Sequence, residues 1–177
     1  MFNSLVALSA ERHQALRLQA SQPYHFAASM MLCPVVYGEI REAARDYVIV
    51  FPRGEGVPQV LLGLTPGTNA YVGAAGHWMC RYVPSNIRRY PFFTARSDSA
   101  TGAASFTVLI DESAPHLGIM EGAPLFTKEG APSSILENVQ KVLITLEKQQ
   151  KATTRLVAEL DRLGLLIERP LQVRWPG

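Results

Sequence analysis

The chain has 177 residues, of which 47% are apolar and 18% are charged, a size and composition that suit one compact domain with a buried core. The 17 Lys and Arg residues nearly balance the 15 Asp and Glu residues, so the net charge does not favour binding to nucleic acid or to an acidic membrane surface. The two cysteines, Cys33 and Cys80, lie too far apart for a Cys-x-x-Cys motif, which argues against a zinc knuckle or a disulfide framework.

The first ten residues contain no Lys or Arg, and the longest apolar run, residues 26–37, is interrupted by Ser29 and Pro34. A secretory signal begins with a basic segment, and a membrane helix needs about 20 apolar residues. We therefore expect a cytoplasmic protein without a membrane span.

The first third of the chain predicts short elements. They are a helix within residues 9–18, extended segments within 24–36, a two-turn helix over 39–46, and an antiparallel hairpin of 47–51 with 59–64. The hairpin is the clearest of them, because residues 47–51 are all aromatic or β-branched. In the second helix, Glu42 and Arg45 are three residues apart and share a face.

The middle of the chain predicts more strands joined by turns. They are a turn over 65–69, strands at 70–72 and 78–83 around a Gly73–Gly76 reversal, a short helix from Pro84 through Arg89, and strands at 92–95 and 105–111 around a polar loop over 96–102. Pro91 must end the helix, since proline disrupts a helix interior.

A long helix is predicted over residues 134–163. Ser134 and Glu137 have the spacing of a capping box, and Gly164 follows as a carboxyl-terminal cap. Beyond it, residues 165–175 alternate apolar and polar side chains, which is typical of an edge strand.

One face of this helix carries an apolar stripe. Its members are Leu136, Val139, Leu143 and Leu146, followed by Val157 and Leu160. Such a stripe either packs on a sheet of the same chain or joins two copies of a helix. The sequence leaves both arrangements open, and the second predicts a homo-oligomer formed through the helix 134–163.

These elements predict an α+β fold, with a mainly antiparallel, bent β-sheet, short helices and one long C-terminal helix. We expect residues 1–177 to form a single domain.

The sequence predicts no cofactor and no metal site. His13, His25, His77 and His116 are scattered, without the spacing of a zinc site. No local motif marks Cys33 or Cys80 as a nucleophile, and the glycines form no phosphate-binding loop.

The segment 77–93 concentrates aromatic residues, arginines and prolines. Its candidate ligand or partner-binding residues are Trp78, Tyr82, Arg88, Arg89 and Tyr90. As a binding surface, the arginines would supply paired donors for a carboxylate or phosphate beside flat aromatic rings. As a structural junction, an arginine would pair with an internal acid such as Asp46 or Asp111 while the aromatic rings fill the core, and this interpretation is favoured.

Several distinct short motifs are spread along nearly the whole chain. They are Glu11-Arg12-His13, Phe26-Ala27-Ala28, Pro34 with Glu39, residues 44–51, Leu62-Gly63-Leu64, residues 69–72, Gly76-His77-Trp78, Tyr82-Val83-Pro84, residues 88–92, Leu125-Phe126 and Gly164-Leu165-Leu166. In order and spacing they resemble the SapC family of bacterial proteins. The resemblance implies an accessory role in S-layer protein production or transport, and it supplies no catalytic residues.

Two departures from the family pattern matter. Family members continue past the point where this chain stops, so the chain is either a short member or truncated at its C-terminus. The turn over 73–76 is Gly-Ala-Ala-Gly where relatives are often acidic, which weakens a cation site there.

The function expected from the sequence is that of a non-enzymatic SapC-like accessory protein that binds a protein or peptide partner. The alternative is a small-ligand-binding protein or an enzyme with a pocket near Trp78, Arg88 and Arg89.

Overall fold

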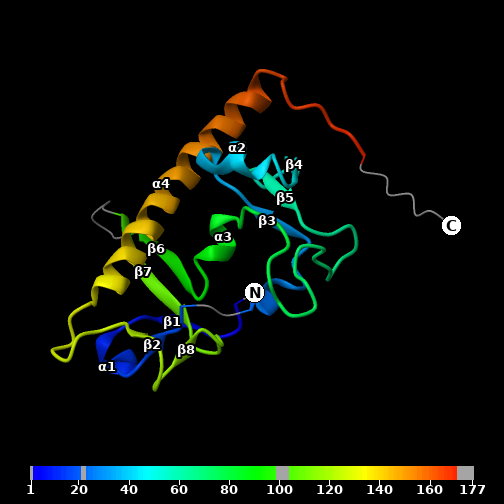
Figure 1. The fold of residues 1–177 in the computed structure, drawn as a ribbon. Coiled ribbons are helices and arrows are strands. Elements are labelled where there is room, and N and C mark those ends of the chain that lie inside the picture. The colour runs from blue at the N-terminus through cyan, green and yellow to red at the C-terminus, as the bar shows by residue number, and fades with distance from the viewer. Residues whose placement is uncertain (1, 21–22, 99–103, 171–177) are drawn as a thin grey trace. The chain divides into compact units, whose positions relative to one another are not determined.

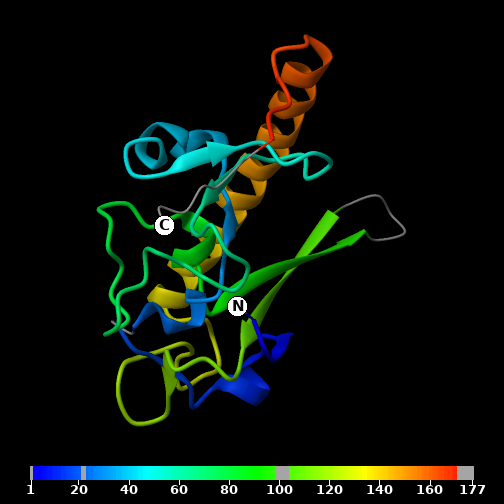
Figure 2. The ribbon, with the colours of Figure 1, turned by 90° about the vertical axis from the view of Figure 1, so that its right-hand side faces the viewer.

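The computed structural model describes residues 2–20, 23–98 and 104–170. The chain forms two compact units. The first contains the residues up to Pro23 together with Arg88–Glu147, and the second contains Tyr24–Ile87 together with the chain from Lys148 onward. One long helix, α4 (Ser134–Arg162; Figures 1 and 2), contributes residues to both units, with its residues up to Glu147 in the first and those from Lys148 in the second. That residues 1–177 fold as a single domain stays a prediction.

The main sheet of the first unit has the antiparallel order β1-β7-β6. The strands are β1 (Leu5–Ala7), β6 (Phe92–Asp98) and β7 (Ala104–Asp111). The two strands predicted around residues 92 and 111 are therefore confirmed. The polar loop is shorter than predicted, because Asp98 pairs with Ala104 and residues 96–98 continue β6. Residues 99–102 of that loop lie outside the described part of the chain.

A second, smaller sheet of this unit is built around β2. Its order is β8-β2-β9, with β2 (Arg17–Leu18), β8 (Leu117–Gly118) and β9 (Ala123–Pro124). A one-turn helix, α1 (Ala10–His13), comes before β2 in the predicted position.

Helix α4 matches its predicted limits to within one residue, but its amino-terminal cap differs. The Oγ of Ser133, not of Ser134, accepts the Leu136 N–H at 3.3 Å, so Ser134 is the first helical residue and no Ser134–Glu137 capping box forms. At the other end Gly164 has φ +66°, as predicted of a cap. The Gly164 and Leu165 amides donate to the carbonyls of Asp161 and Leu160, the pattern of a Schellman motif.

The amino-terminal half of the α4 stripe packs inside the first unit. Leu136 and Leu143 join Phe92, Ile110 and Leu125 in one apolar core. Packing on the chain's own sheet thus accounts for this half, whereas self-association through the helix stays a prediction.

The sheet of the second unit has the antiparallel order β3-β5-β4. It consists of β3 (Leu32–Pro34), β4 (Val48–Val50) and β5 (Gln59–Leu61), and it is accompanied by η1 (Tyr24–Ala27), η2 (Tyr37–Glu39), α2 (Ile40–Ala43) and α3 (Ser85–Arg88). The predicted hairpin is the pair β4-β5. The run 24–36 is not extended throughout, because η1 is a 3-10 turn that buries Ala27.

A threonine in the middle of α4 anchors the second half of the helix to this unit. Thr153 is fully buried, and its Oγ1 accepts the Tyr37 N–H at 2.9 Å while donating to the Gln149 carbonyl at 2.7 Å. The first amide of η2, which has no partner within its own helix, is satisfied in this way.

Two predicted strands are wrong. Residues 70–72 and 78–83 form only a single bridge, between Val72 and Trp78. Side chains take the amides that a ladder would need, because Asn69 Oδ1 accepts the Tyr71 N–H and Asp46 Oδ2 accepts the Tyr82 N–H.

The predicted edge strand at 165–175 is also absent from its described part. Residues 165–170 have no regular structure, and Glu168 forms an ion pair with Arg53 at 2.7 Å. Residues 171–175 lie outside the described residues.

The α+β prediction is confirmed by the antiparallel sheets, the short helices and the long C-terminal helix. Within the described ranges, no helix is both long enough and apolar enough to cross a membrane.

The turn after β5 leaves no room for a side chain at Gly63, so a substitution there should destabilise the protein. A Cβ there would lie 2.1 Å from the Thr68 carbonyl oxygen, which belongs to the turn closed by the Thr68 N–H and the Thr65 carbonyl. We expect Gly63→Ala to lower the free energy of unfolding by about 3 kcal/mol, because backbone must move to relieve the overlap. Urea unfolding measures this change.

Gly54→Ala is the matched control. Gly54, unlike Gly63, has a positive φ, +83°, but no atom lies within 4 Å of its added Cβ. We expect a loss of only about 1 kcal/mol from backbone strain there. Equal losses in the two variants would contradict the close-approach argument.

Candidate functional site

The predicted site residues are divided between the two units. Trp78 and Tyr82 belong to the second unit, whereas Arg88, Arg89 and Tyr90 belong to the first. Each group has a well-defined environment within its own unit.

Trp78 and Tyr82 are held by hydrogen bonds to one another and to their neighbours. Trp78 Nε1 donates to the Tyr47 hydroxyl at 2.7 Å and to the Tyr82 carbonyl at 3.1 Å, and the Tyr47 hydroxyl donates to the same carbonyl. The Tyr82 amide donates to Asp46 Oδ2 at 3.0 Å. These bonds fix the backbone of Tyr82 on both sides.

The faces of Trp78 are occupied by rings of the same unit. Tyr24 meets the indole edge-on at a centroid distance of 5.4 Å, and Tyr71 stacks on it at 6.4 Å. Tyr71 in turn contacts Tyr47 at 4.8 Å. Burial, followed by nearby negative groups, raises the pKa of Tyr71, so its phenol is neutral. The arrangement is an aromatic cluster that packs on the unit's own core.

The side chain of Tyr82 reaches a buried carboxylate. Its hydroxyl donates to Glu39 Oε2 at 3.1 Å, and the Ser85 hydroxyl donates to the same oxygen. Glu39 is 6% exposed, and its Oε1 is buried without a hydrogen-bond partner among the described residues. Glu39 therefore ties the segment before α3 to the end of η2.

Neither cysteine has the environment of a nucleophile. Cys33 is fully buried. Burial and then the negative charge of Asp46 raise the pKa of the Cys80 thiol, so Cys80 is protonated at neutral pH. A reactive cysteine requires the opposite shift, toward the thiolate.

In the first unit, Tyr90 belongs to a network around Asp111. Asp111 is fully buried at the end of β7, and its carboxylate accepts the amides of Asn3 and Ser4 at 2.9 and 3.0 Å. The Ser113 hydroxyl donates to it at 2.7 Å and the Tyr90 hydroxyl at 3.3 Å. One carboxylate thus holds the amino-terminal arm, the turn after β7 and the segment before β6.

The pKa values in this network follow from its hydrogen bonds. Burial alone would raise the pKa of Asp111, but the donors from Ser113, Asn3 and Ser4 outweigh it and lower the pKa below the usual range. Burial, with the charge of Asp111, raises the pKa of Tyr90 to about 12. Tyr90 is therefore a neutral donor to a charged acceptor.

Arg89 lies over an aromatic ring of β6. Its guanidinium carbon is 4.4 Å from the centroid of the Phe93 ring, a cation–π geometry. The centroid of the Phe2 ring is 5.4 Å from that of Phe93 and 5.5 Å from that of Tyr90, so Phe2 contacts both rings. Arg88 is exposed at the end of α3.

A second charged cluster of this unit involves Arg12 and His13. Arg12 binds Glu112 through two bonds of 2.6 and 2.7 Å, and His13 Nε2 lies 3.0 Å from the same carboxylate. Hydrogen bonds from Arg12 and then from His13 lower the pKa of Glu112. His13 is 1% exposed, so this cluster joins α1 to the end of β7 and offers no imidazole to a substrate.

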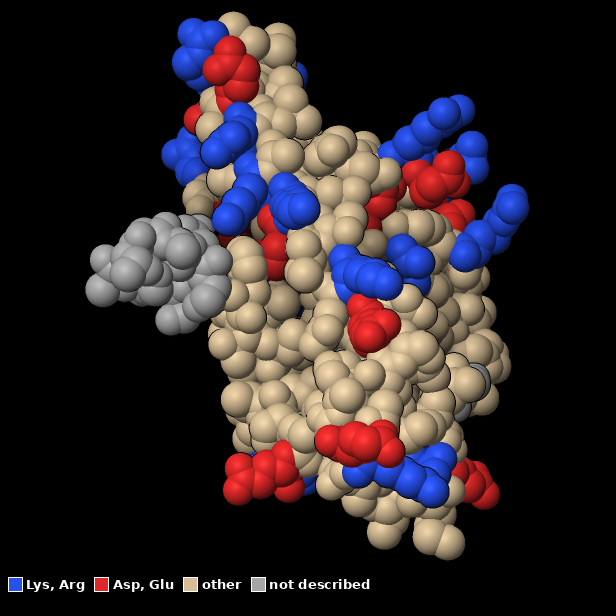
Figure 3. Space-filling model, turned by 90° about the vertical axis from the view of Figure 1, so that its left-hand side faces the viewer, with Lys and Arg blue, Asp and Glu red and all other residues tan. Residues whose placement is uncertain are grey.

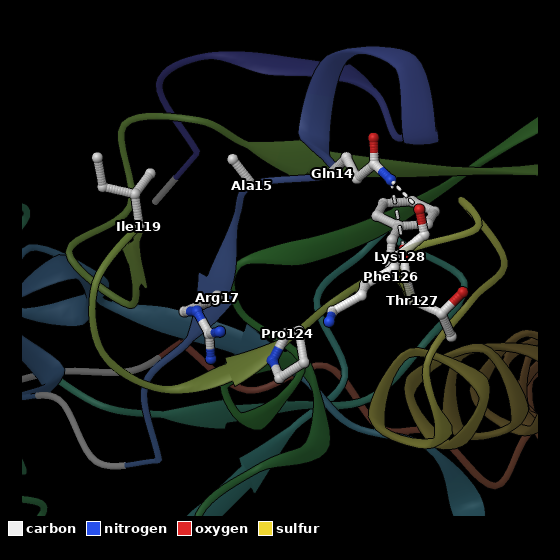
Figure 4. A pocket seen from close by; sticks show the side chains of 8 residues that line it. All are labelled: Gln14, Ala15, Arg17, Ile119, Pro124, Phe126, Thr127 and Lys128. Atoms are coloured by element: carbon white, nitrogen blue, oxygen red, sulfur yellow. Dashed lines mark hydrogen bonds between the residues drawn. The ribbon is translucent and has the colours of Figure 1, made fainter.

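The first unit also contains an open cavity of about 580 Å³ beside β2 and β9, shown in Figure 4. It is lined by Gln14, Ala15, Arg17, Ile119, Pro124, Phe126, Thr127 and Lys128. Ala15, Ile119, Pro124 and Phe126 make its wall mainly apolar, while the lining includes two cations and no acid.

The polar side chains of the cavity are positioned by backbone carbonyls. Arg17 donates to the Gly122 carbonyl at 2.9 Å, and Gln14 Nε2 donates to the Lys128 carbonyl at 2.9 Å. In Figure 4 the guanidinium of Arg17 and the side chain of Lys128 lie on either side of Pro124. Both cations thus border the same apolar wall.

Sequence reasoning missed this cavity. Its lining comes from residues 14–17 and 119–128, which carry no recognisable motif, and β2 brings them together by pairing with both β8 and β9. In the described part of the chain, no three His, Cys, Asp or Glu side chains gather as metal ligands would.

The Asp111 network predicts a pH-dependent loss of stability. We expect Asp111→Asn to lower the free energy of unfolding at neutral pH by about 2 to 3 kcal/mol, because an amide NH₂ would replace one of the acceptor oxygens facing the Asn3 and Ser4 amides. Ser113→Ala, which removes a single donor, should cost about 1 kcal/mol. Denaturant unfolding measures both values.

The difference in the free energy of unfolding between the wild type and Asp111→Asn should become smaller at acid pH. The folded-state pKa of Asp111 is lowered, so its stabilisation is complete above the unfolded value of about 3.9 and is lost as the pH falls through the folded-state pKa. A difference that stays constant down to the acid transition would contradict the assignment.

Arginine substitutions test whether the 77–93 segment is structural. We expect Arg89→Ala to lower the free energy of unfolding by about 0.5 to 1 kcal/mol through loss of the contact with Phe93. The exposed Arg88→Ala should unfold nearly as wild type does, and urea titrations compare the two. Unchanged stability in Arg89→Ala together with lost partner binding would identify a binding residue instead.

The family model described as SapC matches residues 8–177, which is nearly the whole chain. Searches of curated proteins and of solved structures give no match. The matched range contains the buried residues of both apolar cores, the cavity, and Asp111 with Tyr90 and Ser113, but not Asn3 and Ser4, which also donate to Asp111. The chain therefore belongs to the SapC family.

Proposed function

We propose that this protein is a non-enzymatic SapC-like accessory protein that binds an extended peptide segment of a protein partner. The cytoplasm is its expected location, and S-layer protein production or transport is the process that the family name suggests. The observation that carries the proposal is the cavity of the first unit.

The cavity suits a peptide because it is open and mixed in character. Apolar side chains such as Ile119 and Phe126 offer contact area to apolar residues of a partner, while Arg17 and Lys128 offer charge to a carboxylate. Ile119 and its neighbour Met120 are 67% and 85% exposed, so both side chains are accessible to a partner.

A non-enzymatic role is supported by the state of the reactive side chains. His13 is buried against Glu112, Cys33 is buried, and the raised pKa of Cys80 keeps its thiol protonated. Burial lowers the pKa of His116, whose ring lies edge-on to Tyr90 at 5.1 Å. None of these groups borders the cavity.

Binding of synthetic peptides to the full chain tests the proposal. We expect apolar peptides that contain one Glu to bind more tightly than the same peptides with Gln. Arg17→Ala should weaken that binding about fivefold, and added salt should weaken it further, because the contact is partly exposed. Fluorescence anisotropy of labelled peptides gives the affinities.

Arg45→Ala is the matched control, since Arg45 is an exposed arginine of the second unit paired with Glu42. It should leave peptide binding unchanged, and thermal melts should show both variants folded. Failure of every acidic apolar peptide to bind, or equal weakening by Arg45→Ala, would overturn the proposal.

A further inference from the structure

We propose that the carboxyl-terminal half of α4, together with the segment that follows it, docks on a lipid bilayer that contains anionic headgroups. This surface belongs to the second unit, whereas the cavity belongs to the first, so lipid docking is a property separate from peptide binding. The surface combines a row of cations with exposed apolar side chains, which are the two features of a helix that lies on a bilayer.

Three cations form a row along this half of α4. Lys148, Lys151 and Arg155 are all exposed, and residues 148–158 contain no acid. At about 100° per residue, the positions of the three cations fall within a sector of about 60° of the helix. Thr153, which is fully buried, lies on the opposite side of the helix. The row therefore faces away from the core of the second unit.

The acidic side chains near this row are paired or displaced around the helix. Glu159 accepts hydrogen bonds of 2.6 and 2.8 Å from the guanidinium of Arg162, so the charges of this pair offset one another. Glu147, the residue before the row, accepts a hydrogen bond from the Thr94 hydroxyl. Asp161 is displaced from the three cations by about 80° or more around the helix. Figure 3 shows Lys and Arg side chains, with Asp and Glu side chains among them, over the upper part of one face.

Exposed apolar side chains lie beside the cation row. Leu156 and Leu163 are 43% and 53% exposed. They lie about 80 to 100° from Arg155 around the helix, on the same side of it. Just beyond the helix, Leu165 and Ile167 are 63% and 73% exposed. The carboxyl end of α4 thus offers apolar contact area next to positive charge.

A bilayer matches this combination better than a nucleic acid does. Nucleic acid would bind the cations through its phosphates but would leave the leucines in water. An anionic bilayer presents its headgroups to Lys and Arg, and its apolar interior lies directly beneath, where leucine and isoleucine side chains become buried. The net charge of the whole chain is only +2, so the attraction comes from the local row of cations.

Co-sedimentation of the full-length protein with lipid vesicles tests the proposal. We expect binding to vesicles of phosphatidylcholine mixed with phosphatidylglycerol, and little binding to vesicles of phosphatidylcholine alone. Lys148→Gln and Arg155→Gln should each weaken the binding about fivefold, because each removes one cation from the anionic surface. Both variants should also make the binding less sensitive to added salt, which screens the remaining attraction.

Leu163→Gln separates the apolar contribution from that of charge. Gln and Leu have similar helix propensities, so the last turn of α4 should persist in this variant. We expect vesicle binding to weaken about fivefold or more, because a leucine side chain no longer becomes buried in the bilayer. The salt dependence should remain that of the wild type, since the cations are unchanged.

Arg81→Gln is the matched control, since Arg81 is an exposed arginine of the second unit that lies outside α4. It should bind vesicles as the wild type does, and thermal melts should show every variant folded. The proposal is wrong if the wild type binds neither kind of vesicle, binds both equally, or binds as tightly after Leu163→Gln as before. Peptide binding should be unchanged in all of these variants, because none of them alters the lining of the cavity.

Discussion

The first unit depends on one buried carboxylate. Asp111 ends the central strand β7, and it accepts donors from the amino-terminal arm, from Ser113 and from Tyr90. A charged group at full burial is costly unless every lone pair is used, and here the donors come from three separate parts of the chain. Losing one donor therefore loosens all of them. The cavity lies in the same unit, on the small sheet that the amino-terminal segment reaches after α1.

In the second unit, Tyr82 links several segments of the chain, as Asp111 does in the first. Its amide is bound by Asp46, its carbonyl by Trp78 and Tyr47, and its hydroxyl by Glu39. A single residue thus uses its backbone and its side chain to connect the turn before β4, the loop before α3 and the end of η2. The aromatic rings of this part of the sequence contact one another and pack on the core of the unit. A binding role for the segment stays a prediction.

Periodicity and turn chemistry predicted the elements whose bonds are local or lie between neighbouring strands. The helix over 134–163, the hairpin around residues 47–61 and the strands around residue 92 and residue 111 are of this kind. The errors arose where a side chain replaced a backbone partner. Asn69 and Asp46 take amides that a strand would need, and Ser133 accepts the bond expected of its neighbour. The cavity could not be predicted, because its two cations are more than a hundred residues apart and only strand pairing brings their segments together.

Helix α4 belongs to both units, and this gives the chain a particular folding behaviour. Its first half is stabilised by the core around Leu143, and its second half by the hydrogen bond of Thr153 with the Tyr37 amide. Each half alone is near the length at which isolated helices are marginal in water. Opening of either unit would thus remove the tertiary support from half of the helix and leave the other half with a frayed end. Slow hydrogen exchange in the middle of α4 would then report on the less stable of the two cores.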